Sequence, residues 1–355
     1  MKKDRKIKVV EVIPTLHSGG AENVTKFICK YLDRSKFDLT LFCFYKSPKY
    51  NWPKDLNIIF LHKKKGIDLN LITRLKNNLN KIQPDIIHCH NLNSLLYVIF
   101  ARTLFHRPRI VQTIHNDLEK HSNSIFWKII FIIFKIYTVN LSPKINRCLQ
   151  SRKENFNIAN GIELNKFSKP RTNVEVKQIV NIGRLEKQKN HIFLIKAFGY
   201  IAKHDKNLKL IIAGQGTLEK KIKKEVKKLH LQSRVKIIPK HVDSAKLFKK
   251  SDYYISSSFW EGMPLVIIEA LASGLAVFST PAGATEDLIK NNYNGFIYRG
   301  KTPEDLADLF VKESQDKKKI QKIRKNSIKS STYFSAQIMT KKYEKVFKAL
   351  VAKHQ

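Results

Sequence analysis

The chain has 355 residues and carries 67 lysines and arginines against 29 aspartates and glutamates, a formal net charge of +38. The length favours two domains, and a hydrophobic share of 43% with only 13 Gly and 11 Pro excludes a wholly disordered basic protein and a fibrous or low-complexity chain. Residues 1–165 hold 28 basic and 12 acidic side chains, and the other 190 residues hold 39 basic and 17 acidic ones, so the excess of positive charge is not confined to one basic tail. Such a charge attracts polyanions of several classes: nucleic acid, phosphorylated small molecules or anionic lipid.

In the first half, short β-branched runs alternate with stretches of helical spacing. Strands are expected at residues 8–13, 39–44, 58–61, 85–90 and 109–113. Helices are expected at residues 21–32, 69–82 and 95–105. This alternation predicts a parallel sheet covered by helices on both faces.

The second half repeats the pattern. Strands are expected at residues 178–182, 209–213, 235–238, 253–256, 276–279 and 295–297. Helices are expected at residues 191–204, 218–229, 264–273 and 303–314, and an amphipathic helix at 335–352. Residues 165–174 lack either period and contain a proline, so they form the best linker candidate. We therefore expect domains at 1–165 and 174–334, with a helix at 335–355 that packs back toward the N-terminal domain.

Cysteine usage and the apolar segments bear on location. The four cysteines (Cys29, Cys43, Cys89 and Cys148) form no CxxC pair, which favours buried thiols in a cytoplasmic chain. His88 and His90 share one side of their expected strand while Cys89 faces the other, so the three do not form a metal cluster. No signal peptide is visible. Residues 125–137 are too short to span a bilayer. They fit a core helix, or an interfacial helix with Trp127 and Phe131 as aromatic anchors.

Two strand-to-helix turns have residues suited to an anionic ligand. Gly19 and Gly20 follow the first strand, where glycines let the backbone approach a ligand and the next helix offers free N–H groups. Arg184 and Lys189 follow the strand at 178–182. A guanidinium fork and a compact ammonium together could hold a diphosphate. The alternatives are a simple turn and two ordinary surface cations.

Glu269 is the only charged residue between Pro264 and Phe278. A carboxylate in such an apolar helix needs a cation or hydroxyl donors, and ribose hydroxyls would suit it. Glu261 lies eight residues earlier in the preceding loop. The bland alternative is a buried glutamate paired with a lysine or arginine.

These motifs, in this order, resemble the family 4 retaining glycosyltransferases of GT-B fold over nearly the whole chain. The matching pieces are Gly19-Gly20-Ala21-Glu22, Asn160-Gly161-Ile162, Gly183-Arg184-Leu185 with Gln188-Lys189-Asn190, Gly214-Gln215-Gly216, and Glu261 with Gly262-Met263-Pro264-Leu265 and Glu269. The resemblance implies an α/β fold of two Rossmann-like parallel-sheet domains that face each other across a cleft.

The resemblance also implies site roles in the C-terminal domain. Arg184 and Lys189 would bind the donor diphosphate, and Glu269 would take the ribose hydroxyls. Glu261 would act at the donor sugar, together with the backbone of Gly262, Met263, Pro264 and Leu265.

In the N-terminal domain, Gly19 and Gly20 would form the loop that faces the sugar phosphate and the acceptor. His115, at the end of the strand at 109–113, matches the active-site histidine of the family and would contact the donor sugar near the reacting carbon. The sequence departs from the family pattern in two places. The family often has a glycine near Pro239, and it has a Gly-Gly pair where this chain has Ala282-Gly283-Ala284.

The implied reaction moves a sugar from a nucleotide-diphosphate donor to a hydroxyl with retention at the anomeric carbon. We expect no cofactor and no metal, because the chain contains no Asp-x-Asp. We expect a glycan or lipid-linked acceptor, a role in bacterial surface polysaccharide (capsule or lipopolysaccharide) synthesis, and a cytoplasmic protein peripheral on the inner face of the plasma membrane. The alternatives are a GT-B nucleotide-sugar epimerase and a basic nucleic-acid-binding protein, although no nucleic-acid-binding motif is present.

Overall fold

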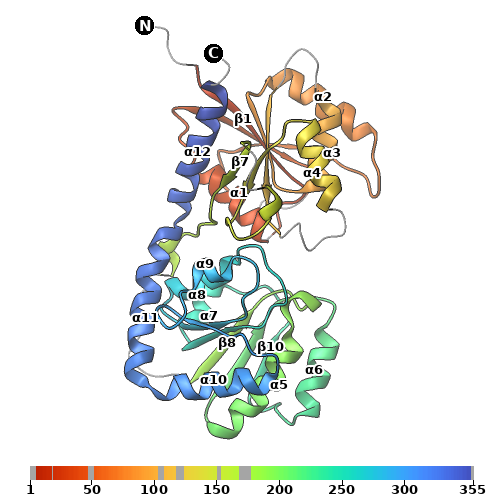
Figure 1. Cartoon of the computed structure of the whole chain (residues 1–355). Coiled ribbons are helices and arrows are strands. Elements are labelled where there is room, and N and C mark those ends of the chain that lie inside the picture. The colour runs from red at the N-terminus through yellow and green to blue at the C-terminus, as the bar shows by residue number, and fades with distance from the viewer. Residues whose placement is uncertain are drawn as a thin grey trace. The chain divides into compact units, whose positions relative to one another are not determined.

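A computed structural model describes residues 5–17, 19–46, 52–102, 108–116, 124–149, 153–167 and 177–352 (Figure 1). The chain divides into two compact units. The first comprises Met1–Gly161 together with Ala336–Gln355, and the second comprises Ile162–Ser335.

The first unit is built on a seven-stranded sheet in the order β3-β2-β1-β4-β5-β6-β7, and every neighbouring pair is parallel. Its strands are β1 (Ile7–Ile13), β2 (Phe37–Cys43), β3 (Asn57–Phe60), β4 (Ile86–Cys89), β5 (Arg109–Ile114), β6 (Tyr137–Asn140) and β7 (Asn155–Asn157). Its helices are α1 (Gly20–Tyr31), α2 (Asn70–Ile82), α3 (Leu92–Ala101), α4 (Ser124–Ile133) and α12 (Ala336–Ala352). The carboxyl ends of the parallel strands therefore share one edge of the sheet.

The two faces of this sheet have separate apolar cores. Val9 and Ile13 of β1 join the core that contains side chains of α1 and α12. Val10 and Val12 join the core that contains side chains of α2, α3 and α4. Because side chains alternate along a strand, Glu11 faces the α12 side with Val9 and Ile13. Figure 1 shows α12 and α1 on one side of the sheet and α2, α3 and α4 on the other.

The second unit has a six-stranded parallel sheet in the order β10-β9-β8-β11-β12-β13. Its strands are β8 (Gln178–Ile182), β9 (Lys209–Ala213), β10 (Val235–Ile238), β11 (Tyr253–Ser256), β12 (Ala276–Ser279) and β13 (Phe296–Ile297). Its helices are α5 (His191–His204), α6 (Glu219–Lys228), α7 (Ser244–Phe248), α8 (Leu265–Ala272), α9 (Thr285–Leu288), α10 (Pro303–Gln315) and α11 (Lys317–Ser331).

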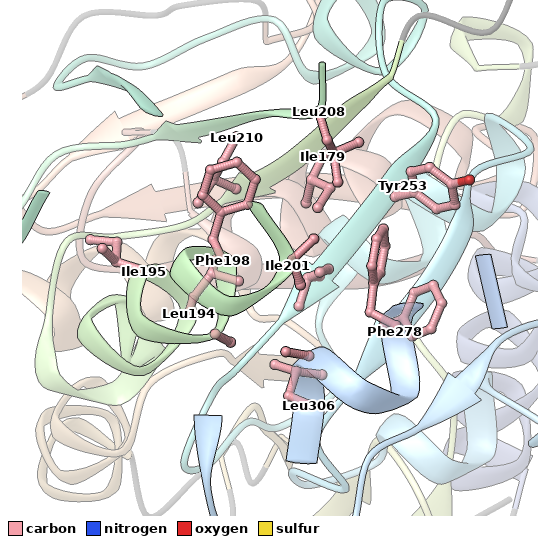
Figure 2. Packing of buried hydrophobic residues seen from close by; sticks show 14 of the residues in the cluster. Ile179, Leu194, Ile195, Phe198, Ile201, Leu208, Leu210, Tyr253, Phe278 and Leu306 are labelled. Carbon is pink, nitrogen blue, oxygen red and sulfur yellow. The ribbon is translucent and has the colours of Figure 1, made fainter. Parts of the chain in front are cut away.

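Figure 2 shows how the core of the second unit is packed. Phe198 and Ile201 of α5 lie against Ile179 of β8, and Phe278 of β12 stacks on Phe296 with ring centroids 4.6 Å apart. Apolar side chains at helical spacing on α5 and on alternate positions of the strands thus meet in one layer. Strand β8 lies inside the sheet, between β9 and β11, and packs against this apolar layer. It leads directly into the loop that carries Arg184.

The structure confirms the α/β class and the two Rossmann-like parallel sheets. The sequence pattern does not predict β6, β7 or α11. β6 follows an apolar helix after only three residues, β7 has three residues, and α11 is dominated by lysines, so none shows a clear period.

The units divide slightly earlier than the sequence indicates. Ile162 pairs with Ser335 in an isolated parallel bridge, and its N–H donates to the carbonyl of Phe334 at 2.9 Å. Residues 162–165, expected in the first domain, thus belong to the second unit. Most of the expected linker, residues 168–174, lies outside the described residues.

Candidate functional site

Two loops of the second unit bring Arg184, Lys189 and Glu261 together. The loop after β8 carries the two cations, and the loop after β11 carries Glu261. Lys189 Nζ lies 2.6 Å from Glu261 Oε1. Gln188 joins both ends, because its Oε1 accepts from Arg184 at 2.9 Å and its Nε2 donates to the carbonyl of Trp260 at 2.9 Å. Residues that the sequence assigns to one ligand therefore form one hydrogen-bonded group.

The Lys189–Glu261 pair is shielded from water, while Arg184 is not. The side chains of Lys189 and Glu261 are 15% and 8% exposed, whereas Arg184 is an exposed residue. An ion pair that is mostly shielded depends on both partners, because removal of one leaves a poorly hydrated charge. Lys189 is thus part of the fold of this loop pair as well as a candidate ligand for phosphate.

Glu269 lies on α8 and is partly buried rather than fully buried as the sequence indicated. Burial raises the pKa of its carboxyl, while a hydrogen bond with Ser244 and the charge of Lys166 act against that rise. A hydroxyl donor was one of the two partner types expected for this carboxylate. The second oxygen of a carboxylate that accepts one hydroxyl has room for further hydroxyl donors.

The backbone from Gly262 to Pro264 leads into α8, which begins at Leu265. Pro264 is the N-cap residue and Leu265 is the first helical residue, so the first N–H groups of α8 have no acceptor within the helix. Gly283 holds this segment from the other side, with a φ of +60°. A Cβ at Gly283 would lie 2.1 Å from the carbonyl oxygen of Glu261. The Ala-Gly-Ala departure from the family pattern therefore keeps the glycine at the position where the backbone is closest.

Gly214 and Gly216 form a Gly-x-Gly segment after β9 that packs against the backbone of the loop after β8. A Cβ at Gly214, whose φ is +148°, would lie 1.9 Å from the carbonyl oxygen of Gly183, and a Cβ at Gly216 would lie 2.4 Å from that of Leu185. The loop after β9 thus lies directly against the backbone that carries Arg184, and only glycine fits that approach.

In the first unit, Gly19 and Gly20 lie at the start of α1. Gly19 is the N-cap residue, and its carbonyl accepts from Asn23 at 3.0 Å. A Cβ at Gly19 would meet the Glu22 carboxylate at 2.2 Å, while a Cβ at Gly20 would meet nothing within 4 Å. Both glycines follow β1 at the same sheet edge at which His115 follows β5.

His115 is partly exposed and is held by a second histidine. Its Nε2 lies 3.1 Å from Nδ1 of His90, and the two rings stack with centroids 5.4 Å apart. Burial lowers the pKa of His115 well below its ordinary value, and the neighbouring His90 and His88 lower it further. His115 is therefore a neutral imidazole at pH 7.

Glu11 is a buried carboxylate that the sequence reasoning missed. Its Oε2 lies 2.6 Å from Nε2 of His90 and its Oε1 lies 3.0 Å from Nδ1 of His88. Burial alone would raise the pKa of Glu11, but interactions with His88 and His90 lower it to about 2. The signal was available, because Glu11 is the only acidic residue in an apolar strand, the same argument that identified Glu269.

Among the described residues, Glu11, His88 and His90 form a group whose donor atoms all lie within 4.8 Å of one another, close enough for a metal ion. His88 and His90 do face the same side of the sheet, and Cys89 joins the opposite core. In the structure each carboxylate oxygen is already hydrogen-bonded to a histidine nitrogen. The expectation that the protein uses no metal and no cofactor stays a prediction.

Comparisons with known proteins follow this division of the chain. The family model described as Glycosyltransferase Family 4 matches residues 18–148, and that described as Glycosyl transferases group 1 matches residues 163–330. The UDP-Gal:alpha-D-GlcNAc-diphosphoundecaprenol alpha-1,3-galactosyltransferase of Escherichia coli is 24% identical over 345 residues, 88% of each chain.

A second relative is the N-acetylgalactosamine-N,N'-diacetylbacillosaminyl-diphospho-undecaprenol 4-alpha-N-acetylgalactosaminyltransferase of Campylobacter jejuni. It is 27% identical over 302 residues, 77% of this chain and 81% of its own. Among solved structures, Anabaena HepE in complex with UDP-glucose superposes with a TM-score of 0.82 at 18% identity, over 97% of this chain and 100% of its own. A glycosyltransferase of Rickettsia africae gives 0.79 at 20% identity, over 99% and 100%.

The glycine contacts give a first prediction. We expect Gly214→Ala to destabilise the second unit by about 2 kcal/mol or more, because an L side chain is strained at this φ and its Cβ would overlap the carbonyl of Gly183. The matched control is Gly199→Ala within α5, where the nearest atom to a new Cβ is 3.8 Å away. Alanine there should stabilise by about 0.5–1 kcal/mol. Urea unfolding measures both, and an unchanged midpoint for Gly214→Ala would contradict the contact.

The exposure difference gives a second prediction. Arg184→Ala should weaken binding of nucleoside diphosphates and leave the melting temperature unchanged. Lys189→Ala should weaken binding and also lower stability by about 1–3 kcal/mol, because Glu261 is left without its cation. Calorimetric titration and thermal unfolding check both. The double variant Lys189→Met with Glu261→Gln should regain stability but not binding, and equal stability losses for both single variants would refute the assignment.

Proposed function

The chain belongs to the group 1, family 4 glycosyltransferases, which makes it a transferase of GT-B fold. From this premise we propose that it transfers a sugar from a nucleotide-diphosphate donor to a hydroxyl of a lipid-linked glycan. We propose that the transfer retains the configuration at the anomeric carbon. We further propose that the product serves bacterial surface polysaccharide synthesis. Two relatives whose names specify undecaprenol diphosphate acceptors support the acceptor class.

One observation carries the donor half of the proposal. Arg184, Lys189 and Glu261 lie in a single hydrogen-bonded pair of loops at the carboxyl edge of the second sheet. Ligands of open parallel sheets bind at that edge. The two cations supply the positive charge that a diphosphate needs, and Glu261, which is paired with Lys189, supplies a carboxylate that can accept from hydroxyls of the attached sugar.

The proposed roles follow from what each group can donate or accept. Arg184 and Lys189 bind the diphosphate and spread its charge as it leaves. Glu269 accepts ribose hydroxyls with the oxygen that Ser244 does not occupy. The backbone from Gly262 to Leu265, which leads into the first turn of α8, and Glu261 hold the donor sugar.

In the first unit, Gly19 and Gly20 offer backbone N–H groups to the sugar phosphate, and His115 contacts the sugar near its reacting carbon. The leaving diphosphate takes the proton of the acceptor hydroxyl on the same face, so no covalent nucleophile is required. Catalysis then consists of positioning and electrostatic stabilisation of the leaving group. Two cations and a helix N-terminus provide that stabilisation without a metal ion.

The test is a donor screen. The purified chain is incubated with nucleotide-sugars and an undecaprenyl-diphosphate-linked acceptor, and release of the nucleoside diphosphate, the glycolipid product and its anomeric configuration are measured. We expect transfer with retention, reduced by about 100-fold or more in Arg184→Ala and in Glu269→Ala.

Other outcomes would overturn the proposal. Epimerised donor without transfer would identify a nucleotide-sugar epimerase. Tight, salt-dependent DNA binding that Arg184→Ala leaves unchanged, with no transfer, would identify a nucleic-acid-binding protein.

We also propose that α4 holds the protein peripherally on an anionic membrane. Trp127 and Phe131 are buried in the sheet core, so the expected aromatic anchors are wrong. The opposite face of the helix is apolar and exposed, with Ile125 at 73% and Ile133 at 64%. Exposed apolar faces of this kind mark interaction sites. Exposed Lys128 lies beside this apolar face, and the net charge of +38 favours anionic lipid as the surface that covers it.

Among the described residues, no helix is long and apolar enough to cross a bilayer.

The membrane prediction uses the exposed face. Ile129→Ser with Ile132→Ser should reduce binding to phosphatidylglycerol vesicles by about tenfold or more, because both side chains lose their burial in lipid. The control is Ile328→Ser on α11, which is 47% exposed. Vesicle sedimentation measures binding, and circular dichroism checks the fold. Binding that is unchanged in the double variant would show that α4 does not contact lipid.

A further inference from the structure

A chain of hydrogen bonds crosses three neighbouring strands of the first unit and ends at His115. Glu11 lies on β1, His90 directly follows β4, and His115 directly follows β5. We propose that Glu11, acting through His90, fixes His115 in the tautomer whose Nδ1 carries no proton, so that His115 accepts a hydrogen bond from a hydroxyl of the bound sugar. Glu11 and His90 are then positioning residues. This inference rests on the proposed function for the role of His115, but not for its tautomer.

The direction of each hydrogen bond follows from the ionised carboxylate. Glu11 can only accept, so Nε2 of His90, 2.6 Å from Oε2, must be the protonated nitrogen. A neutral His90 then has a lone pair on Nδ1. Nε2 of His115 lies 3.1 Å from that lone pair and must donate to it. The remaining nitrogen of His115, Nδ1, is left without a proton.

That nitrogen is the one available to a ligand. His115 is partly exposed, while His90 and Glu11 are buried. The described residues show no hydrogen-bond partner for Nδ1 of His115. An imidazole whose protonated nitrogen is held inward presents an acceptor outward, and a sugar offers hydroxyl donors to it.

A second arm holds the carboxylate in place. Nδ1 of His88 lies 3.0 Å from Glu11 Oε1, and its Nε2 lies 2.7 Å from the Thr113 hydroxyl. That hydroxyl lies 2.9 Å from the Tyr343 hydroxyl on α12. Burial raises the pKa of Tyr343, so its hydroxyl stays protonated, and either of the two hydroxyls can be the donor. With both oxygens taken, Glu11 cannot rotate away from His90.

The other titratable groups around Glu11 do not compete for this role. Cys29 on α1 and Cys89 on β4 are buried thiols whose pKa values burial and the nearby Glu11 charge both raise, so they stay neutral. Burial and His88 lower the pKa of His90 to about 4, although Glu11 acts against that shift. Between pH 5 and pH 8 the carboxylate is therefore ionised and His90 neutral, which is the state that the tautomer assignment needs.

Packing of the apolar core does not by itself require the buried carboxylate of Glu11 and its two histidines. Glu11 lies among Val9, Ile13, Phe347 and other members of an apolar core. An apolar residue of similar volume would cost less free energy at such a position than a charged one. A buried carboxylate with two histidines has two chemical uses here, to fix a tautomer or to bind a metal ion.

The decisive experiment is long-range ¹H–¹⁵N NMR of the full chain labelled in histidine, at pH 7. It reports which ring nitrogen of His115 carries the proton, with His115→Gln used for assignment. We expect Nε2–H alone in the wild type and a mixture of tautomers in Glu11→Gln. Tyr343→Phe, which removes a hydrogen bond of the second arm only, should keep the wild-type pattern and serves as the control for loss of stability in the network.

Kinetics provide the second measurement once a donor is known. Glu11→Gln should lower kcat by about tenfold or more with KM for the donor within about twofold, because the ring is present but in the wrong tautomer. Tyr343→Phe should keep kcat. If no donor is turned over, the proposed function fails while the NMR result still decides the tautomer.

Two results would overturn the inference. Glu11→Gln that loses stability but keeps the His115 tautomer, and kcat per folded molecule, would mean a structural role only. Stoichiometric zinc or another transition metal in the purified wild type, measured by plasma mass spectrometry and lost in Glu11→Gln, would mean that the three side chains form a metal site.

Discussion

A strand that runs parallel to its neighbours delivers its last residue to the same edge of the sheet as theirs, and the chemistry of both units depends on this constraint. In the first unit it brings the ends of β1, β4 and β5 together, so Gly19, His90 and His115 share one edge although they lie far apart in sequence. In the second unit it places the loops after β8, β9 and β11 side by side. Because backbone hydrogen bonds fix that arrangement, the side chains need little further ordering to act together.

Close backbone contact is the second requirement of the loops after β8 and β11, which carry Arg184, Lys189 and Glu261. Gly214 and Gly283 have positive φ values and lie where a Cβ would overlap a neighbouring carbonyl. The glycines thus allow the loop after β9 to pack against the loop after β8, and the loop after β12 to pack against the loop after β11, without side chains between them. Arg184 and Lys189 belong to the loop after β8. The Lys189–Glu261 pair adds a charged contact between the loops after β8 and β11, so a diphosphate that binds Lys189 must share it with a carboxylate.

The fold could be predicted from sequence because each half alternates short β-branched runs with amphipathic helices. The parts that could not include β6, β7, α7 and α9, which are short, and α11, which is rich in lysine. For the site, the glycines, the cations and Glu269 are visible as local patterns. The partners are not, since Ser244, His88 and Glu11 meet their groups only after the sheets form. Glu11 shows that a carboxylate inside an apolar strand can have buried partners even when no motif surrounds it.

The net charge of +38 has a smaller role in this account than its size suggests. Arg184 and Lys189 are the two cations that we propose to bind the donor, and others, such as Lys166 with Glu163 and Arg324 with Asp252, make ion pairs within the fold. The long-range field of the rest favours approach to an anionic surface.

The position of α12 has a consequence for how the protein is made. Tyr343 and Phe347 complete the core on one face of the first sheet, yet they follow the whole second unit in sequence. During synthesis the first sheet emerges early with that face covered by α1 but not by α12, and the second unit, which is continuous in sequence, can close before it. The first unit can finish folding only after α12 has left the ribosome, so Glu11 and its two histidines acquire their full cover later than the second unit closes.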